Sequence, residues 1–368
     1  MAPVCWFAGL TTLDVVHRAA APPGRDRKIT ASRQDVAAGG PAANAAVTAA
    51  ALGARAVLVT ALGTGPVATA ARADLEAHGV EVLDVAAALP AAQAAAFPLA
   101  VSAALVDEAT GERSVVSADA ALAAAPAPAP AALAALPRPD AVLLDGHHPA
   151  IARAVLAHVD ALGAAPRRFP PEDLPEVADA QGGAGPAGPD AGGRPFVVLD
   201  CGRWRPLFAE LVPAADVAAC SADFTVPADV APRPGLPAQS PLTTPADAVP
   251  GVAPPTPDQR VAAAVLALGA RAVVVTHGPG PVDLTTTAFT FPDGSPYGQA
   301  VQTSGVTAVD TLGAGDAFHG ALTAALATGR RLSAAVGTAT AVATERVQHV
   351  GPRGWLSAVR PLTETKEP

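Results

Sequence analysis

The stretch VDTLGAGDAFHGAL, residues 309–322, passes from a polar turn through two glycines into an alanine-rich helix. Asp316 falls where that helix is expected to begin. Asp is common at helix starts and glycine in the turn before them, so Asp316 could simply cap the helix. A helix start also offers unpaired backbone N–H groups and the positive end of the helix dipole, and both favour a bound anion.

Short β-branched runs alternate with alanine-rich windows along the rest of the chain. The runs lie at residues 57–62, 141–145, 196–200 and 272–276. Apolar runs separated by helices indicate a parallel sheet that is covered on both faces. The sequence therefore predicts an α/β fold with a doubly wound, mainly parallel sheet flanked by helices.

We expect one domain over residues 1–368, with four segments that do not follow this alternation of strands and helices. Residues about 15–37 and 97–117 have the pattern of antiparallel strands and predict a small accessory sheet over the main one. Residues about 164–195 and 227–257 are rich in Pro, Gly and Ala, and we expect them to be mobile surface insertions.

Composition excludes several classes of function. The net charge is −9 and the 24 basic residues are scattered, so we expect no nucleic-acid partner. The first residues, MAPVCWFAGL, lack the cationic region of a signal peptide, and no window is a good bilayer span, so we expect a cytoplasmic protein without a membrane partner. The lysines are Lys28 and Lys366, and neither stands where a P-loop or a protein kinase needs one.

Two polar segments near the start of the chain are further candidates for a site. Asp14 lies just past the expected first strand, where parallel sheets bind ligands, although a solvated loop residue would look the same. Gly39 and Gly40 precede a helix that contains Asn44. The glycines would let the backbone approach a ligand closely, and the amide offers both a donor and an acceptor.

Together, VDTLGAGDAFHGAL, the GGPAAN of residues 39–44 and the early Asp14 resemble the ribokinase-like, or PfkB, family of carbohydrate kinases. The resemblance covers nearly the whole chain apart from the two insertions. The Pro-Ala-Ala after the glycine pair and DAFHGAL resemble ketohexokinase-like and sulfofructose-kinase-like members more than ribokinase itself. The resemblance implies ATP-dependent phosphorylation of a hydroxyl of a small sugar or sugar derivative, with Mg²⁺ and in many members K⁺.

The resemblance also implies roles for the residues that match the family motifs. Asp316 would be the general base, and the backbone of Gly313, Ala314 and Gly315 would form the anion hole for the transferred phosphate. Asp14, Gly39, Gly40 and Asn44 would hold the sugar.

Other matches concern the nucleotide and the cations. Thr276, Gly278 and Gly280 resemble the family's nucleotide-side turn, with an ordinary β-turn as the alternative. Asp310 and Thr311 match the loop where many members place a monovalent cation, with a structured turn as the alternative.

The sequence departs from the family pattern in two places. Many members carry Asn-x-x-Glu where this chain has Ser221-Ala222-Asp223-Phe224, so Ser221 and Asp223 would have to serve the phosphates and Mg²⁺. Lys28, on the accessory sheet, could meet an anionic group of the substrate, with a solvated surface lysine as the alternative. Gly146-His147-His148 stands where some kinases of anionic sugars place an Arg. The absence of that Arg weakens the prediction of an anionic sugar as the substrate.

Two alternatives to a sugar kinase remain. A nucleoside kinase of the same fold would need an aromatic-lined base pocket, and only 4% of the residues are aromatic. The absence of the Asn-x-x-Glu motif favours a non-catalytic sugar or nucleotide sensor. The presence of Asp316 with its anion hole disfavours it, because a sensor would have no reason to keep them. In this family the accessory sheet often forms a lid that pairs with a second copy, so the resemblance implies a homodimer.

Overall fold

The computed structural model of the protein describes six stretches of the chain: residues 1–163, 165–172, 178–179, 193–232, 256–290 and 296–362. Most of the two predicted insertions lies outside these residues. In the described part of the first insertion, Phe169 is buried and stacks on Phe196 at a ring-centroid distance of 5.3 Å. That part therefore packs against the protein.

The main sheet has ten strands in the order β14-β13-β12-β11-β10-β8-β1-β4-β5, with β9 paired to β13. Pairing is parallel from β5 to β12, and β13 is antiparallel to β12, β14 and β9. The predicted mainly parallel sheet is confirmed. Its strands are β1 Val4–Ala8, β4 Arg55–Thr60, β5 Val80–Asp84, β8 Ala141–Leu144, β9 Ala178–Asp179, β10 Phe196–Cys201, β11 Val217–Ser221, β12 Ala272–Thr276, β13 Val282–Thr290 and β14 Pro296–Val301.

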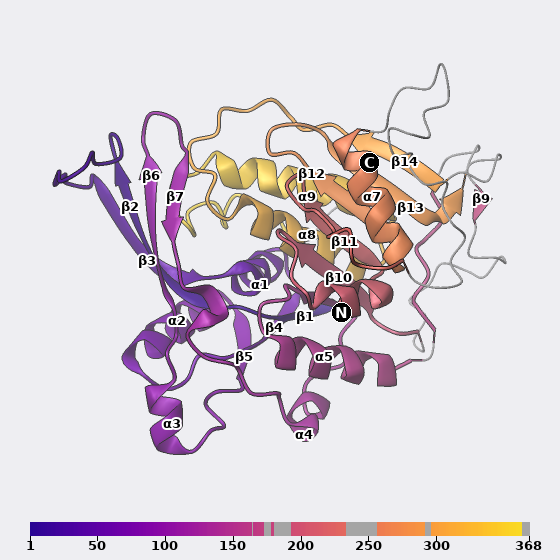
Figure 1. Ribbon diagram of the computed structural model, residues 1–368, viewed down its shortest axis with the longest axis horizontal. Coiled ribbons are helices and arrows are strands. Elements are labelled where there is room, and N and C mark those ends of the chain that lie inside the picture. Colours follow the sequence, from indigo (N-terminus) through magenta and orange to yellow (C-terminus); the bar gives the residue numbers. More distant parts are fainter. Residues whose placement is uncertain (164, 173–177, 180–192, 233–255, 291–295, 363–368) are drawn as a thin grey trace.

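Helices cover both faces of this sheet, as Figure 1 shows. Cys5 and Phe7 of β1 point into the core on one face of the sheet, and Trp6 and Ala8 point into the core on the other face. This alternation is the period of a strand buried on both faces. One side holds α1 Pro41–Ala51, α2 Pro66–Ala77, α8 Ala314–Ala327 and α9 Leu332–Val347, and the other holds α4 Pro130–Ala134, α5 Pro149–Ala161, α6 Phe208–Leu211 and α7 Pro257–Leu268. The short α3 spans Ala91–Ala96. No described helix combines the length and the apolar character that a membrane crossing requires.

A second, four-stranded sheet has the order β3-β2-β6-β7 and projects to one side of the main sheet (Figure 1). Its strands are β2 Thr12–Ala19, β3 Arg33–Gly39, β6 Val101–Asp107 and β7 Arg113–Val116. The outer pairs are antiparallel as predicted, but the central pair, β2 and β6, is parallel. We call these four strands the small sheet.

The small sheet is tied to the segment that precedes α8. Arg18 Nη2 of β2 donates to the carbonyl of Val309 at 2.8 Å. Arg113 Nη1 of β7 donates to the carbonyl of Thr311 at 3.2 Å. Two strands from different parts of the chain therefore hold the turn that leads to Asp316.

The strand order reverses between β1 and β8. From β1 the chain adds β4 and β5 on one side, and then β8, β10, β11 and β12 on the other. At such a reversal the loops leaving neighbouring strands diverge, and a crevice opens beyond the carboxyl ends of the strands. The fold thus predicts a ligand site beside the ends of β1 and β8.

Helices α1 and α8 cross closely at Gly320. A Cβ at this position would lie 2.3 Å from the carbonyl oxygen of Ala45 and 2.8 Å from Cβ of Thr48. Glycine is unfavourable inside a helix, so its presence in α8 is explained by the close approach of the α1 backbone. The crossing sets how near the start of α1 comes to the start of α8.

Replacing Gly320 by Ala should force these helices apart. We expect Gly320→Ala to lower the free energy of unfolding by about 1–3 kcal/mol, the usual cost of overpacking a core. The matched control is Gly337→Ala in α9, where nothing lies within 4 Å of the added Cβ. That change should stabilise the helix by about 0.5–1 kcal/mol. Urea unfolding of both variants measures the difference, and equal stability would show that the crossing tolerates a wider spacing.

Candidate active site

A cavity of about 400 Å³ lies beyond the carboxyl ends of β1, β8 and β10, between the main sheet and the small sheet. Its walls come from the loop after β1, the start of α1, the small sheet, the residues that follow β8 and β10, and the start of α8. The lining residues used below are Asp14, Gly40, Asn44, Ser102, Arg113, Asp145, His147, Asp200, Arg203, Arg205 and Asp316.

Asp316 lies in the first turn of α8 and lines this cavity. Its Oδ2 accepts a hydrogen bond from Nδ2 of Asn44 at 2.8 Å. Burial raises the pKa of Asp316 to about 6, and the negative charge of Asp200 adds to the rise, while the Asn44 hydrogen bond opposes it. Such a carboxylate is ionised at neutral pH and is a stronger base than an exposed aspartate.

The side chain of Asn44 is oriented by a cation from the other end of the chain. Arg353 Nη1 donates to Oδ1 of Asn44 at 3.1 Å. Arg353 Nη2 in turn donates to Asp74 at 2.8 Å and to the carbonyl of Ala38 at 2.6 Å. Because the amide oxygen of Asn44 faces a donor, its nitrogen is the atom left to bond Asp316. The sequence analysis missed both Arg353 and Asp74, which lie in segments without a motif.

A buried ion pair stands beside Asp316. His319, one turn further along α8, has Nδ1 3.0 Å from Oδ2 of Asp200 at the end of β10. Burial alone would raise the pKa of Asp200, but the neighbouring His319 holds it below its ordinary value. Burial would lower the pKa of His319, and the Asp200 charge raises it instead. His319 belongs to the quoted motif, yet its partner comes from a distant strand, so the sequence analysis assigned neither residue.

The turn before α8 has the geometry of an anion-binding helix start. Gly313 has φ +74°, a left-handed conformation that favours glycine, and a Cβ there would lie 3.8 Å from Oδ2 of Asp316. A Cβ at Gly315 would meet nothing within 4 Å. The backbone N–H of Ala314 donates to the carbonyl of Thr311 at 3.4 Å. The first N–H groups of a helix have no partner within it, so those of Gly315 and Asp316 are placed to meet an anion.

The two N-terminal segments predicted to hold a substrate also meet at the cavity. Asp14 accepts a hydrogen bond from Oγ1 of Thr12 at 2.6 Å, and burial is the main reason that its pKa is raised. A Cβ on Gly39 would lie 2.0 Å from Oδ2 of Asp14, and one on Gly40 2.5 Å from the carbonyl oxygen of Leu10. Because both positions are glycine, the backbone at residues 39–40 can lie directly against the Asp14 carboxylate and the loop after β1.

Asp145 is a structural acid of the site that the sequence analysis did not assign. Its Oδ2 accepts from the backbone N–H groups of Leu10 at 2.8 Å and Ala42 at 3.3 Å, and its Oδ1 accepts from His147 N at 2.9 Å. One buried carboxylate thus joins the loop after β1, the start of α1 and the turn after β8.

Three arginines line the cavity, and the sequence analysis missed them. Arg203 and Arg205 follow β10, and Arg113 comes from β7 of the small sheet. Arg205 Nη2 lies 2.8 Å from Nε2 of His147. The segment after β8 lacks an Arg as noted, but the neighbouring strand brings two to the same cavity. His148 is buried at the start of α5 and does not line it.

Several predicted residues lie away from this cavity. Lys28 is exposed in the segment before β3 and does not line it. Thr276 ends β12, and Gly278 and Gly280 lie in the connection to antiparallel β13, where Gly280 N donates to the carbonyl of His277 at 3.1 Å. This hydrogen bond is that of a β-turn, and the predicted role of these residues toward the nucleotide stays a prediction.

Ser221 ends β11 and Asp223 follows it at the same edge of the sheet, outside the cavity lining. Ser221 Oγ donates to the carbonyl of Gly202 at 2.7 Å, and Asp223 is exposed. Their predicted role toward phosphate and Mg²⁺ stays a prediction.

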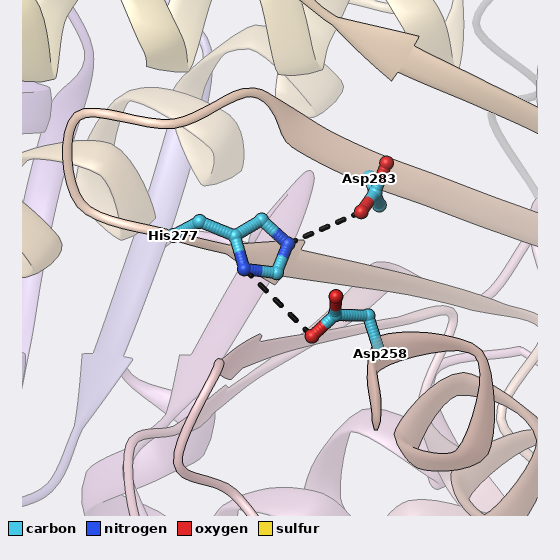
Figure 2. A group of neighbouring side chains, drawn as sticks. All are labelled: Asp258, His277 and Asp283. Carbon is cyan, nitrogen blue, oxygen red and sulfur yellow. Dashed lines mark hydrogen bonds and ion pairs between the residues drawn. The ribbon is translucent and has the colours of Figure 1, made fainter. Parts of the chain in front are cut away.

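Figure 2 shows a separate group near the β12–β13 turn, in which two aspartates flank the ring of His277. Nε2 of His277 lies 3.1 Å from Asp283, and Nδ1 lies 3.7 Å from Asp258. The carboxylates approach different nitrogens of one imidazole, whereas the ligands of a metal ion converge on one point. The arrangement is therefore that of a histidine held by two acids.

Comparison with solved structures gives the same fold. A putative ribokinase from Agrobacterium tumefaciens is 24% identical, with a TM-score of 0.67 over 97% of this chain and 94% of that one. Arabidopsis thaliana ribokinase, solved with ribose and ATP, is 19% identical, with a TM-score of 0.62 over 98% and 96% of the two chains. Ribokinase from Cryptococcus neoformans var. grubii, solved with ADP, is 15% identical, with a TM-score of 0.57 over 98% of each chain.

A search of curated protein sequences gives no significant match. The family model described as pfkB family carbohydrate kinase matches residues 5–165 and 246–358, which include every segment that builds the cavity except β10 and the residues after it. The finer resemblance to ketohexokinase-like and sulfofructose-kinase-like members stays a prediction. The ribokinase-like fold and this match confirm the predicted family, and the chain belongs to the pfkB family of carbohydrate kinases.

Proposed function

We propose that the protein is an ATP-dependent kinase that phosphorylates a hydroxyl of a small sugar or sugar derivative. The observation that carries the proposal is the carboxylate of Asp316, which lines a polar cavity at the start of α8 and has a pKa raised to about 6. ATP use is supported by the ribokinases of the same fold that were solved with ATP or ADP.

In this proposal Asp316 accepts the proton of the acceptor hydroxyl as that oxygen attacks the γ-phosphorus of ATP. The O–H bond breaks, the new O–P bond forms, and ADP leaves with the electron pair of the broken P–O bond. The N–H groups at the start of α8 stabilise the negative charge on the transferred phosphoryl oxygens. Asn44 fixes the direction of the Asp316 carboxylate.

The acceptor would lie between Asp316 and Asp14, both of which line the cavity. The carboxylate of Asp14 and the hydroxyl of Ser102 suit the hydroxyls of a polyol. Mg²⁺ would neutralise the phosphate charge and be held largely by phosphate oxygens and water, with Asp223 the sequence-predicted acid at this edge of the sheet. The small sheet would act as a lid that excludes water and prevents hydrolysis of ATP.

The small sheet also supports the proposal of a homodimer. Val36, Val101 and Val116 on three of its strands are 53%, 47% and 77% exposed. A second copy that covered this face would remove apolar surface and strand edges from water. Analytical ultracentrifugation tests this proposal, and a monomer at micromolar concentration would contradict it.

Asp316→Asn should abolish most turnover while keeping the fold. The amide has the same shape and can still bond Asn44, but it cannot accept a proton, so we expect the rate to fall about 10²–10⁴-fold. ADP formation with Mg²⁺ is measured against ketoses, aldoses, sugar acids, sulfosugars and nucleosides. The control is Asp229→Asn, which changes an exposed carboxylate outside the cavity lining and should leave the rate unchanged.

The outcomes of this panel separate the candidate functions. Acceptor-dependent ADP formation that is lost in Asp316→Asn supports the sugar kinase. Turnover restricted to nucleosides would favour the nucleoside kinase. Nucleotide or sugar binding without turnover by any member would favour the sensor.

The three arginines favour an acceptor that carries an anionic group beside its hydroxyls. A guanidinium matches carboxylate, phosphate and sulfonate with two parallel hydrogen bonds. Arg203 is exposed at the mouth and Arg205 is half-buried beside His147. Asp14 and Asp316 line the same cavity, so the hydroxyls of such an acceptor would keep carboxylate partners while the arginines hold its anionic group.

We expect Arg203→Gln to raise KM for an anionic sugar about 10–100-fold, the loss of one charge-assisted hydrogen bond. The matched neutral sugar should keep its KM. Steady-state kinetics with the two acceptors measures this. A rise in KM for ATP instead would assign the arginine to the nucleotide.

A further inference from the structure

The family resemblance predicts a monovalent cation at Asp310 and Thr311, but each of these residues already has a guanidinium beside it. Nη2 of Arg346 lies 3.5 Å from Oδ1 of Asp310. Nη1 of Arg113 donates to both the carbonyl and Oγ1 of Thr311 at 3.2 Å. The residues present therefore do not fit a free cation in addition, because a second positive charge would be repelled.

Arg346 is almost completely enclosed. It lies in the last turn of α9 and is 2% exposed, and Asp310 is 1% exposed. Nη1 donates to the carbonyl of His349 at 2.9 Å and more weakly to that of Asp310 at 3.5 Å. Nη2 makes no hydrogen bond within the described residues, so Asp310 is its charge partner. A buried charge without a partner is costly, and the pair is therefore a specific arrangement.

The carboxylate of Asp310 joins the turn before α8 to the segment after α9. Oδ1 accepts from the backbone N–H of Leu312 at 3.0 Å, and Oδ2 accepts from that of Gly351 at 3.0 Å. The backbone N–H of Val309 also donates to the carbonyl of Val347 at 2.8 Å. The guanidinium lies between these two segments, next to the glycine turn that begins at Gly313.

Backbone carbonyl oxygens and one carboxylate directed at a positive charge are also the ligands that a monovalent cation uses. Here the positive charge belongs to the side chain of Arg346, which cannot leave the site as a bound ion can. Arginine keeps its proton at any physiological pH, so the charge is permanent.

We infer that the guanidinium of Arg346 takes the place of a monovalent cation beside Asp310 and holds the anion-binding turn of α8 in position, so that the enzyme needs no K⁺. Arg346 is a positioning residue, since it touches the turn and not the reacting atoms. The inference rests on the proposed kinase function for its kinetic test, but not for its test by stability.

The first test uses the wild-type protein in KCl, NaCl and choline chloride at an ionic strength of about 0.1 M, so that screening is equal. ADP formation and the thermal unfolding midpoint should be the same in all three salts. A rate or midpoint that depends on K⁺ in the wild type would overturn the inference.

The second test uses Arg346→Met, which removes the charge and keeps most of the length. In choline chloride the rate should fall roughly tenfold to a hundredfold, the range expected when a reacting group is misplaced. K⁺ should restore part of the rate and raise the unfolding midpoint. Arg346→Lys, which keeps a cation, should stay independent of K⁺.

Arg153→Met is the matched control. Arg153 forms an exposed pair with Glu210 on the opposite side of the main sheet, and its loss should create no response to K⁺. If Arg346→Met is as active as the wild type in choline, or Arg346→Lys requires K⁺, the inference is wrong. If no acceptor is turned over in any salt, the proposed function fails while the unfolding midpoints still decide about Arg346. Failure of Arg346→Met to fold would leave the decision to the wild type and Arg346→Lys.

Discussion

The close crossing of α1 and α8 at Gly320 is the constraint on which the rest of the site depends. Both helices begin at the carboxyl edge of the main sheet, and α1 carries Asn44 in its first turn while α8 carries Asp316. Because the backbones touch, the amide of Asn44 reaches the carboxylate of Asp316 at 2.8 Å. A wider spacing would leave that carboxylate without its donor and more accessible to water.

The segment from Asp310 to Asp316 combines a carboxylate that is paired with an arginine and a carboxylate whose pKa is raised. Asp310 is paired with Arg346 and bonded by backbone N–H groups, so it serves structure. Burial and the negative charge of Asp200 raise the pKa of Asp316, and its one amide hydrogen bond, from Asn44, opposes that rise. The difference lies in their partners and not in the residue type. The proposed roles, structural for Asp310 and basic for Asp316, rest on this difference.

The sequence predicted the parts of the site that lie within short motifs. Gly313, Gly315, Asp316, Gly40 and Asn44 could be found because turn and helix-start preferences are local, and the alternating runs predicted the sheet that brings them together. The homodimer and the residue roles are still predictions.

The partners that tune the site could not be predicted in the same way. Arg353 with Asp74, and His319 with Asp200, join residues that are far apart in the chain, and only the fold reveals their contacts. Arg203 and Arg205 follow a strand without a recognisable pattern. The parallel pairing of β2 with β6 likewise depends on the path of the chain between them and not on the composition of either strand.

The pH dependence of kcat/KM for the best acceptor tests the central claim most directly. If Asp316 is the base, it must be ionised, so kcat/KM should be level above the pKa of about 6 and fall about tenfold for each pH unit below it. A profile that stays level down to about pH 4, the ordinary pKa of an aspartate, would contradict a base with a raised pKa.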